Sequence, residues 1–345
     1  MHRTARYLDD RILGDLLPSA SEAAEPCTAA LVALERRACA DDPGLSDQPP
    51  KVPVAVGRPG AFAHGMPAAV VLDGTRLVGA KWISGDPERP PPRLSGLLLI
   101  EDPEVGGVRG ILSASAVTGV RTAAVSLAAL RAAPPRTEGA ASGRPWRVAL
   151  VAGGTQAVHH RAALEQVAPD ATVTFVTRRA PGELPLRPND AATGPDRLHE
   201  AVAEADLVIT SVAFGTPGRE LDPSRIRPGA TVVATDYATA VTARTVAGVR
   251  EHGADWTGPR LITDDPVQFD ATRAKGALPD YPPADATLGA LLRDPASDAG
   301  RAVRERPVGA TVVVNHLGVA VCDLAVGWAA LRRAEAAGAG VLLPR

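Results

Sequence analysis

A short stretch in the middle of the chain has the residue types and spacing of a turn that can bind the phosphates of a dinucleotide. Residues 148–157 read VALVAGGTQA, an apolar strand that runs through a turn into the start of a helix. On the pattern G-x-G-x-x-G, the three glycine positions are Ala152, Gly154 and Ala157. The middle glycine, which lets the backbone approach a pyrophosphate, is present, whereas Ala152 replaces the glycine of the tight turn. Taken alone, the stretch fits both a dinucleotide site and an ordinary buried corner between a strand and a helix.

The surrounding sequence favours a dinucleotide. The turn begins a strand–helix–strand unit, and TRR, residues 177–179, ends its second strand, where an NAD site would have an acid for the ribose hydroxyls. Arginine there can instead pair with a 2′-phosphate, although two solvated loop arginines would look the same. We therefore expect NAD or NADP as cofactor, with NADP slightly favoured, while Ala152 leaves the binding itself open. The contacts expected here are Gly153, Gly154, Thr155, Gln156, Thr177, Arg178 and Arg179.

The chain uses arginine as its default cation. Of its 37 basic residues, only Lys51, Lys81 and Lys275 are lysines. In such a chain a lysine can mark a position that needs a compact ammonium group rather than a planar guanidinium. An ordinary surface position is an equal alternative for each of the three.

The composition is typical of a soluble globular protein. The chain has 345 residues, which is enough for one large domain or two ordinary ones. Of these residues 45% are hydrophobic and 22% are charged, and the net charge is −2. The chain has no basic excess for nucleic acid, no apolar run that could span a membrane and no signal-peptide core at the N-terminus. Cys27, Cys39 and Cys322 are far apart, and the adjacent His159 and His160 diverge, so we expect reduced thiols, a cytoplasmic location and no metal site.

The pattern of apolar residues divides the chain into two parts. The first has a helix-like stretch near 20–40, strand-like runs with tight turns near 66–102, and a long Ala-rich helix near 113–133. Beyond a Pro/Gly-rich linker, continuous apolar strands alternate with helices over 146–236, which predicts a doubly wound α/β domain whose parallel sheet is covered on both faces. A last strand and helix over 310–338 break this alternation and could return to the first part.

Four motifs in a fixed order make a specific family resemblance. They are GAKWIS (residues 79–84), LSGLLLIEDPE (94–104), VRTAAVS (120–126) and NHLGVAVCDLA (315–325). Together with the glycine turn, they make the chain resemble the ornithine cyclodeaminase / μ-crystallin family over roughly residues 50–335. Within that family it is most similar to the dehydrogenases of 2,3-diaminopropionate biosynthesis, a likeness that includes the paired acids Asp264 and Asp265 in LITDDPVQF.

The resemblance implies a fold and an assembly. It implies a Rossmann-type doubly wound dinucleotide-binding domain over residues 131–305. This domain is inserted into a discontinuous α+β domain, residues 1–130 and 306–345, that binds the substrate and dimerises. The same likeness implies a homodimer with a small amino-acid substrate. The charge and the apolar runs already argue against nucleic-acid and membrane partners.

The resemblance also implies roles for particular residues. Lys81 and Arg121 match the family's cations that hold the substrate carboxylate, and Asp236 matches its catalytic aspartate. Lys81 is expected beside the reacting carbon, and so it counts as catalytic too. Arg58 and Met66 are the other expected substrate contacts. Further cofactor contacts are implied for Ser95, Arg121, Thr122, Ser211, Val212, Ala234, Thr235, His316 and Leu317.

These roles combine into one chemistry. Cations that fix an α-carboxylate orient the Cα–H for hydride transfer to a nicotinamide, and a carboxylate such as Asp236 takes the amine proton or activates the water that attacks an imine. We therefore expect a NAD(P)-dependent amino-acid dehydrogenase acting on a C–N bond. Its most specific form would cleave N-(2-amino-2-carboxyethyl)-L-glutamate oxidatively to 2,3-diaminopropionate and 2-oxoglutarate for a siderophore or another natural product.

Two departures from the family pattern keep alternatives open. His64 stands where ornithine cyclodeaminase has a glutamate for the distal amine of its substrate, which argues against cyclodeaminase activity on ornithine or lysine. Ketimine reductase or alanine-dehydrogenase-like activity would share every site residue. Because of Ala152, the alternative of another class is a catalytically silent member that acts as a binding or scaffold protein.

Overall fold

A computed structural model of the chain describes residues 4–38, 46–58, 60–89, 93–104 and 106–344. The two cysteines in these ranges, Cys27 and Cys322, are free and buried, whereas Cys39 lies outside the described residues. Within the same ranges, no helix combines the length and the apolar character needed to cross a membrane.

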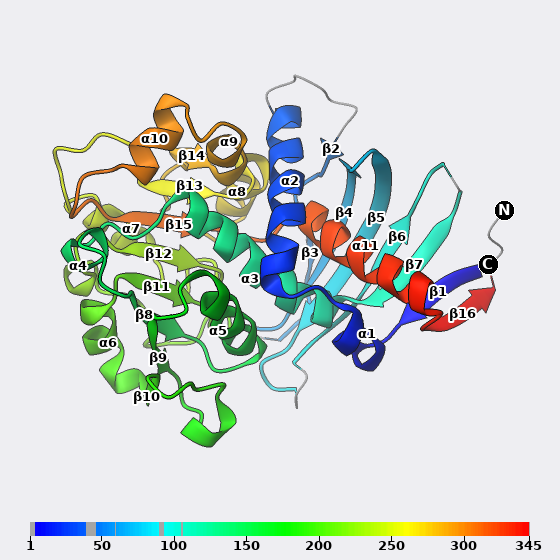
Figure 1. The fold of residues 1–345 in the computed structure, drawn as a ribbon, viewed down its shortest axis with the longest axis horizontal. Helices are drawn as coiled ribbons and strands as arrows, with labels where there is room; N and C mark the ends of the chain where they lie inside the picture. The colour runs from blue at the N-terminus through cyan, green and yellow to red at the C-terminus, as the bar shows by residue number, and fades with distance from the viewer. Residues whose placement is uncertain (1–3, 39–45, 59, 90–92, 105, 345) are drawn as a thin grey trace. The chain divides into compact units, whose positions relative to one another are not determined.

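The chain forms two compact units (Figure 1). The first contains Met1–Ala124 and Gly318–Arg345, and the second is Val125–Leu317. The first unit is therefore discontinuous in sequence. Its boundaries fall inside a long helix and directly after Leu317, rather than at the expected residues 131 and 305.

The first unit is built on a mixed, mainly antiparallel sheet covered by helices. Its strands are β1 (Thr4–Leu8), β2 (Ser46–Asp47), β3 (Val52–Val54), β4 (Phe62–Leu72), β5 (Thr75–Gly85), β6 (Leu94–Glu101), β7 (Val108–Ser113) and β16 (Val341–Pro344). The helices are α1 (Asp10–Leu16), α2 (Ala20–Ala38), the start of α3 (Ala114–Ala132) and α11 (Ala320–Ala337). The strand order is β16-β1-β7-β6-β5-β4-β2, with β3 paired to β4. Asp73 and Gly74, both with positive φ, close the β4–β5 hairpin, and α2 and α11 pack against each other and against β4.

The second unit is a parallel sheet with helical crossovers. Its strands are β8 (Arg147–Val151), β9 (Thr172–Val176), β10 (Ala191–Thr193), β11 (Leu207–Thr210), β12 (Thr231–Ala234), β13 (Leu261–Thr263), β14 (Ala286–Thr287) and β15 (Val312–Asn315). The α-helices are α4 (Glu138–Ala141), α5 (Thr155–Val167), α6 (Leu198–Glu204), α7 (Ala243–Val249), α8 (Pro266–Ala274), α9 (Leu288–Arg293) and α10 (Asp298–Arg304). Short 3-10 turns lie at Pro181–Glu183, Pro195–Arg197 and Pro223–Arg225.

The topology of this second sheet predicts at which edge a ligand would bind. The strand order is β10-β9-β8-β11-β12-β15-β13-β14, with every described pairing parallel, so the chain order reverses between β8 and β11. Open parallel sheets bind ligands at such a switch point, outside the carboxyl ends of the strands. Strands β11, β12 and β15 are buried along their whole length, as their unbroken apolar runs predict. The predicted fold class, a doubly wound Rossmann-type domain inserted into a discontinuous α+β domain, is confirmed.

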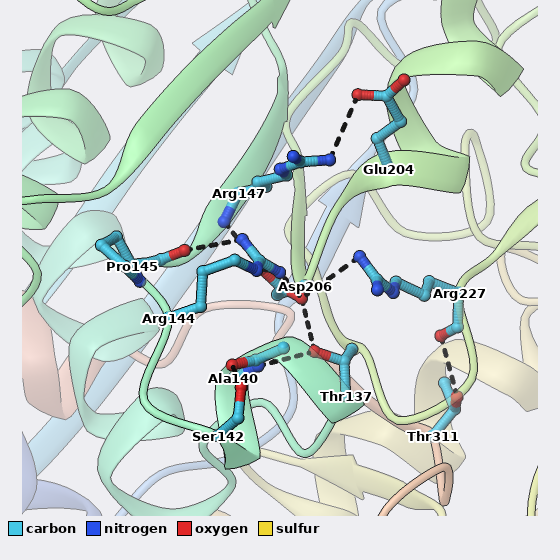
Figure 2. Close-up of polar contacts among 11 residues, drawn as sticks. Thr137, Ala140, Ser142, Arg144, Pro145, Arg147, Glu204, Asp206, Arg227 and Thr311 are labelled. Atoms are coloured by element: carbon cyan, nitrogen blue, oxygen red, sulfur yellow. Dashed lines mark hydrogen bonds and ion pairs between the residues drawn. The ribbon is translucent and has the colours of Figure 1, made fainter.

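A buried aspartate fastens the segment after α3 to the opposite, amino end of this sheet (Figure 2). Asp206 is 0% exposed, and its Oδ2 accepts from Arg144 Nη2 at 2.7 Å and from the Arg147 backbone N–H at 2.8 Å. Thr137 Oγ1 donates to Oδ1, and Arg227 Nη1 lies 3.7 Å from the same oxygen. The carboxylate is therefore fully paired, as a buried charge has to be.

We expect Asp206→Ala to lower the free energy of unfolding by about 3–5 kcal/mol, because it leaves the cations around this site without their buried partner. Urea unfolding of the whole chain would measure the loss. The matched control is Arg147→Ala, which keeps the backbone donor and removes only an exposed pair with Glu204 at 3.7 Å. That variant is expected to cost less than about 1 kcal/mol. An equally small loss for Asp206→Ala would show that the cluster contributes little.

Candidate active site

In the first unit, a lysine and an arginine share one buried aspartate. Lys81 Nζ on β5 donates to Asp323 Oδ2 at 2.7 Å, and Arg121 Nε on α3 donates to Asp323 Oδ1 at 3.2 Å. Lys81 is 1% exposed, Arg121 8% and Asp323 0%. Thr118 Oγ1, one helical turn before Arg121, lies 3.4 Å from Lys81 Nζ. With Lys81 protonated the cluster carries two positive charges and one negative charge, so it can accept one further carboxylate.

Burial makes the charge of Lys81 adjustable. Removal from water lowers the pKa of Lys81 to about 7, although Asp323 acts in the opposite direction, and the positive charge of Arg121 lowers it further. A second carboxylate beside Lys81 would favour its ammonium form. This cluster can therefore bind a carboxylate, and the bound carboxylate in turn favours the protonated form of Lys81.

Of the other two residues predicted to contact substrate, Met66 lies beside Lys81 in the sheet, whereas Arg58 pairs elsewhere. Met66 is 3% exposed and pairs directly with Lys81 across β4 and β5. His64, two residues earlier, pairs with Ile83 and so shares that face of the sheet. Arg58 is not part of the cluster: its Nη2 lies 2.9 Å from Asp86 Oδ2, and its side chain is 56% exposed.

The cofactor contacts predicted in the first unit lie in two places. On α3, Thr122 follows Arg121 directly, and its hydroxyl donates to the Thr118 carbonyl at 2.7 Å. On β6, Ser95 lies 3.2 Å from the hydroxyl of Ser84 and accepts from Arg89 Nη1 at 2.9 Å.

Asp323 was not among the predicted site residues. It lies in the first turn of α11, within the otherwise apolar run VAVCDLAV. An acid inside such a run has to be paired when it is buried, and this was the available signal. Only the fold shows that its partners come from β5 and α3.

In the second unit, the glycine turn has the geometry of a phosphate-binding turn. A Cβ on Gly153 would lie 2.0 Å from Thr177 Oγ1, so a larger residue there would have to displace the Thr177 side chain at the end of β9. A Cβ on Gly154 would meet no described atom within 4 Å. Gly154 is also the N-cap of α5 and offers no side chain to its first turn, where Thr155 and Gln156 begin the helix.

Ala152 fits this turn without strain. Among the described residues, the non-glycine positions with positive φ are Asp73, Tyr237 and Asp280. Ala152 therefore does not need the conformation that favours glycine, and it is 3% exposed in the core. The departure from the glycine pattern leaves the turn intact.

Arginines gather where the second strand of this unit ends. Arg178 and Arg179 are exposed, and Arg179 Nη1 lies 3.7 Å from Glu183. Burial, and then the positive charge of Arg178, lower the pKa of Arg219 in the loop after β11. Arg219 was not predicted. Positive charges close enough to influence one another suit an anion such as a phosphate.

Asp236 lies at the carboxyl end of β12, at the predicted ligand edge. It is 1% exposed; its Oδ1 accepts from Thr210 Oγ1 and its Oδ2 from the Val212 N–H, both at 3.1 Å. Burial raises the pKa of Asp236 to about 6, while these hydrogen bonds act in the opposite direction. Such a carboxyl group can exchange a proton near neutral pH. Tyr237, the next residue, has a φ of +58°, the kind of strained backbone found at functional sites.

Backbone hydrogen bonds join the other predicted cofactor contacts to this edge. The Ser211 N–H donates to Val151 O and the Thr235 N–H to Thr210 O, both at 3.0 Å. The His316 N–H donates to Ala234 O at 3.1 Å. The Leu317 N–H donates to Asp264 Oδ1 at 3.1 Å. The residues after β8, β11, β12 and β15 thus lie along one edge. Within the described part of the chain, no group of three or more His, Cys, Asp or Glu side chains could hold a metal ion.

Comparisons with known sequences give two curated relatives. No protein-family profile matches the chain. It is 24% identical to the nodulation efficiency protein NfeD of Rhizobium meliloti, over 87% of this chain and 88% of the relative. It is 30% identical to Δ1-pyrroline-2-carboxylate reductase 2 of Burkholderia ambifaria, over 53% of this chain and 55% of the relative.

Comparisons with solved structures establish the fold over almost the whole chain. The Δ1-pyrroline-2-carboxylate reductase of Thermococcus litoralis, solved with NADH and L-proline, superposes with a TM-score of 0.73 at 18% identity, covering 97% of this chain and 99% of the other. An archaeal alanine dehydrogenase, solved as a dimer with NAD, gives 0.72 at 19% identity and 99% of each chain. A probable ornithine cyclodeaminase from Bordetella pertussis gives 0.72 at 21% identity, with 97% and 98% covered. These three enzymes therefore share the fold of this chain over nearly its whole length.

Proposed function

We propose that this protein is a NAD(P)-dependent oxidoreductase of the ornithine cyclodeaminase / μ-crystallin family that acts on the C–N bond of an amino acid. The observation that carries the proposal is the buried cluster in which Lys81 and Arg121 share Asp323 and can accept one more carboxylate. The intact glycine turn and the buried Asp236 of the second unit add the parts that a dinucleotide and a proton transfer require. A reductase and a dehydrogenase among the structural neighbours, solved with NADH and NAD, support the same class.

The roles follow from the charges. Lys81 and Arg121 bind the α-carboxylate and fix the orientation of the Cα–H. A bound nicotinamide supplies the acceptor for the hydride. Asp236, with a pKa of about 6, takes a proton from the amine or from the attacking water.

The specific reaction proposed is the oxidative cleavage of N-(2-amino-2-carboxyethyl)-L-glutamate. A bound NAD(P)⁺ would supply the two-electron acceptor for oxidation of the glutamate Cα–N bond to C=N. Water would then add to the carbon of that bond, and the carbon–nitrogen bond would break to give 2-oxoglutarate and 2,3-diaminopropionate, with one proton released. The likeness of GAKWIS, LSGLLLIEDPE and VRTAAVS to dehydrogenases of this pathway supports it. Incubation with this substrate and either dinucleotide is expected to raise the absorbance at 340 nm, and no change with either would refute the reaction.

A second candidate reaction is the reduction of a cyclic imine or ketimine. The 30% identity to a Δ1-pyrroline-2-carboxylate reductase over about half of each chain favours it. The same cluster would bind the imine's carboxylate. Loss of absorbance at 340 nm with Δ1-pyrroline-2-carboxylate and a reduced dinucleotide, without activity on the glutamate conjugate, would select this reaction over the first.

The cofactor preference proposed is NADP(H) over NAD(H). Arg178 and Arg219 together provide the positive charge that a 2′-phosphate requires. Comparison of the two dinucleotides in the same assays tests this preference directly.

We also propose that the protein is a homodimer that covers one face of the first sheet. Lys81 and Leu98 point toward α11, so their strand neighbours point away from it. On that other face, apolar side chains are exposed: Val52 (55%), Val54 (45%), Trp82 (48%), Leu97 (43%) and Leu99 (38%). A contiguous apolar patch of this kind marks an interface, and the similar alanine dehydrogenase is a dimer.

The dimer predicts a simple charge test. We expect Trp82→Glu combined with Leu97→Glu to convert the protein to a monomer in sedimentation velocity, because two carboxylates would be buried at the interface without partners. Val308→Glu, which changes a 47% exposed valine of the second unit, is the control and should leave the dimer intact. A wild-type protein that sediments as a monomer would contradict the proposal.

A further inference from the structure

Three buried polar side chains of the second unit form a hydrogen-bonded chain. Ser126 Oγ on α3 lies 2.9 Å from Nε2 of His160 on α5, and 3.0 Å from Nε2 of His316, which follows β15. Nδ1 of His160 lies 2.9 Å from the carbonyl oxygen of Gln156. All three side chains are 1% exposed, so bulk water does not compete for these bonds.

The carbonyl of Gln156 fixes the direction of this chain. A carbonyl only accepts, so Nδ1 of His160 carries the ring proton. Burial lowers the pKa of His160 to about 4, so its Nε2 carries no proton at neutral pH. The Ser126 hydroxyl therefore donates to His160, and its oxygen can accept from Nε2–H of His316. In its neutral form His316 is thereby held with the proton on Nε2 and with Nδ1 as the acceptor.

The low pKa of His160 also distinguishes between two possible roles of these hydrogen bonds, a proton relay and the orientation of a ring. A proton relay would need His160 to hold a second proton, which burial disfavours at neutral pH. A fixed tautomer needs only the neutral ring. The geometry therefore suits orientation of His316 rather than transfer of a proton through Ser126.

The chain connects two segments of the candidate ligand edge. Gln156 and His160 belong to the first turns of α5, directly after the glycine turn. The His316 N–H donates to Ala234 O, two residues before Asp236. Both segments lie at the carboxyl end of parallel strands, where ligands of open α/β sheets bind.

We propose that Ser126 and His160 are positioning residues that fix the tautomer and ring orientation of His316 for dinucleotide recognition. This inference rests on the proposed function, because the ligand it concerns is the nicotinamide end of a dinucleotide. The carboxamide of that group carries N–H donors, which match a ring nitrogen that has no proton. Ser126 and His160 act only through His316 and are not themselves ligand contacts in this account.

The first experiment measures the tautomers in the ligand-free protein. Long-range ¹⁵N–¹H correlation spectra of the full chain, labelled at its seven histidines, distinguish a proton on Nδ1 from one on Nε2. His160→Phe and His316→Phe assign the two rings. We expect His160 to carry its proton on Nδ1 and His316 on Nε2. The opposite tautomer at either ring would overturn the proposal.

The second experiment measures dinucleotide affinity by fluorescence of the bound reduced nicotinamide. We expect Ser126→Ala to raise the Kd about tenfold, the effect of one lost buried hydrogen bond. Ser126→Thr, which keeps the hydroxyl, should restore the affinity, and Ser142→Ala, at an exposed serine, should leave it unchanged. In the His316→Phe background, Ser126→Ala should add no further loss.

The outcomes separate a positioning role from a merely structural one. If folded Ser126→Ala protein, checked by thermal unfolding, binds as tightly as wild type, or if its loss adds fully to that of His316→Phe, the positioning role is wrong. If the wild-type protein binds neither dinucleotide, the proposed function fails and the ligand role of His316 with it. The tautomers measured in the ligand-free protein would then still show whether the hydrogen bonds through Ser126 fix the tautomer of His316.

Discussion

Replacing Asp236 with asparagine is expected to reduce turnover by about a hundredfold or more while the dinucleotide Kd stays within about twofold of wild type. The amide can accept from the Val212 N–H with its oxygen and donate to Thr210 Oγ1 with its nitrogen, because a hydroxyl can reverse its role. The variant therefore keeps these two hydrogen bonds and loses the group that exchanges a proton. Steady-state rates with the preferred substrate, together with a dinucleotide titration, measure both quantities. An unimpaired rate would remove Asp236 from the mechanism.

The role of Asp236 as a base can also be tested through the pH dependence of the rate, with Thr210→Val as the matched variant. As a base, Asp236 works in its ionised form, so oxidation is expected to slow as the pH falls below about 6. The hydrogen bond from Thr210 favours the ionised carboxylate. Thr210→Val removes that bond without changing the side-chain shape, so it should raise the pKa of Asp236 and move the acid limb of the rate profile to higher pH. An acid limb that does not move would show that another group controls it.

Replacing Lys81 with methionine is expected to weaken amino-acid binding by about a hundredfold or more, because the substrate carboxylate would lose a buried cation. Methionine fills a similar volume, and Asp323 keeps its pair with Arg121, so the variant should fold. Substrate KM and product-inhibition constants measure the loss. The control is Lys275→Met, which removes an exposed lysine of the second unit. Equal affinities in the two variants would contradict the assignment of Lys81.

The charge of Lys81 predicts a further pH effect on binding. Since burial lowers its pKa to about 7, the free protein loses the ammonium form as the pH rises above 7. A bound carboxylate favours the ammonium form, so substrate binding should take up a proton in this range. Substrate affinity is therefore expected to fall as the pH rises from 7 to 9, and Lys81→Met should remove that dependence.

The sequence predicted the parts of the fold that local patterns determine. The apolar runs around Val148–Val151 and Thr231–Ala234 are buried parallel strands, as their unbroken hydrophobicity indicated. The Ala-rich segment forms α3, and the final helix, α11, belongs to the first unit, where the broken alternation allowed it to return. Lys81 is the one scarce lysine that proves fully buried in a charged cluster.

Contacts between distant segments could not be read from the sequence. Asp323 lies 242 positions from Lys81, and nothing local shows that the two pair. Ser126 and His316 are separated by 190 positions, so no spacing rule links them. Whether the turn tolerates Ala152 depended on a backbone angle that only the fold supplies. Arg58 had a suitable charge, but its pairing with Asp86 is set by the path of a loop.

The most direct test of the proposed function is a titration of the purified protein with NADPH and NADH, followed by fluorescence. Both candidate reactions require a dinucleotide, whereas a silent binding or scaffold protein does not. The intact turn at Gly153 and Gly154 and the arginines at the end of β9 predict saturable binding in the micromolar range, tighter for NADPH. No binding of either dinucleotide at millimolar concentration would contradict the account.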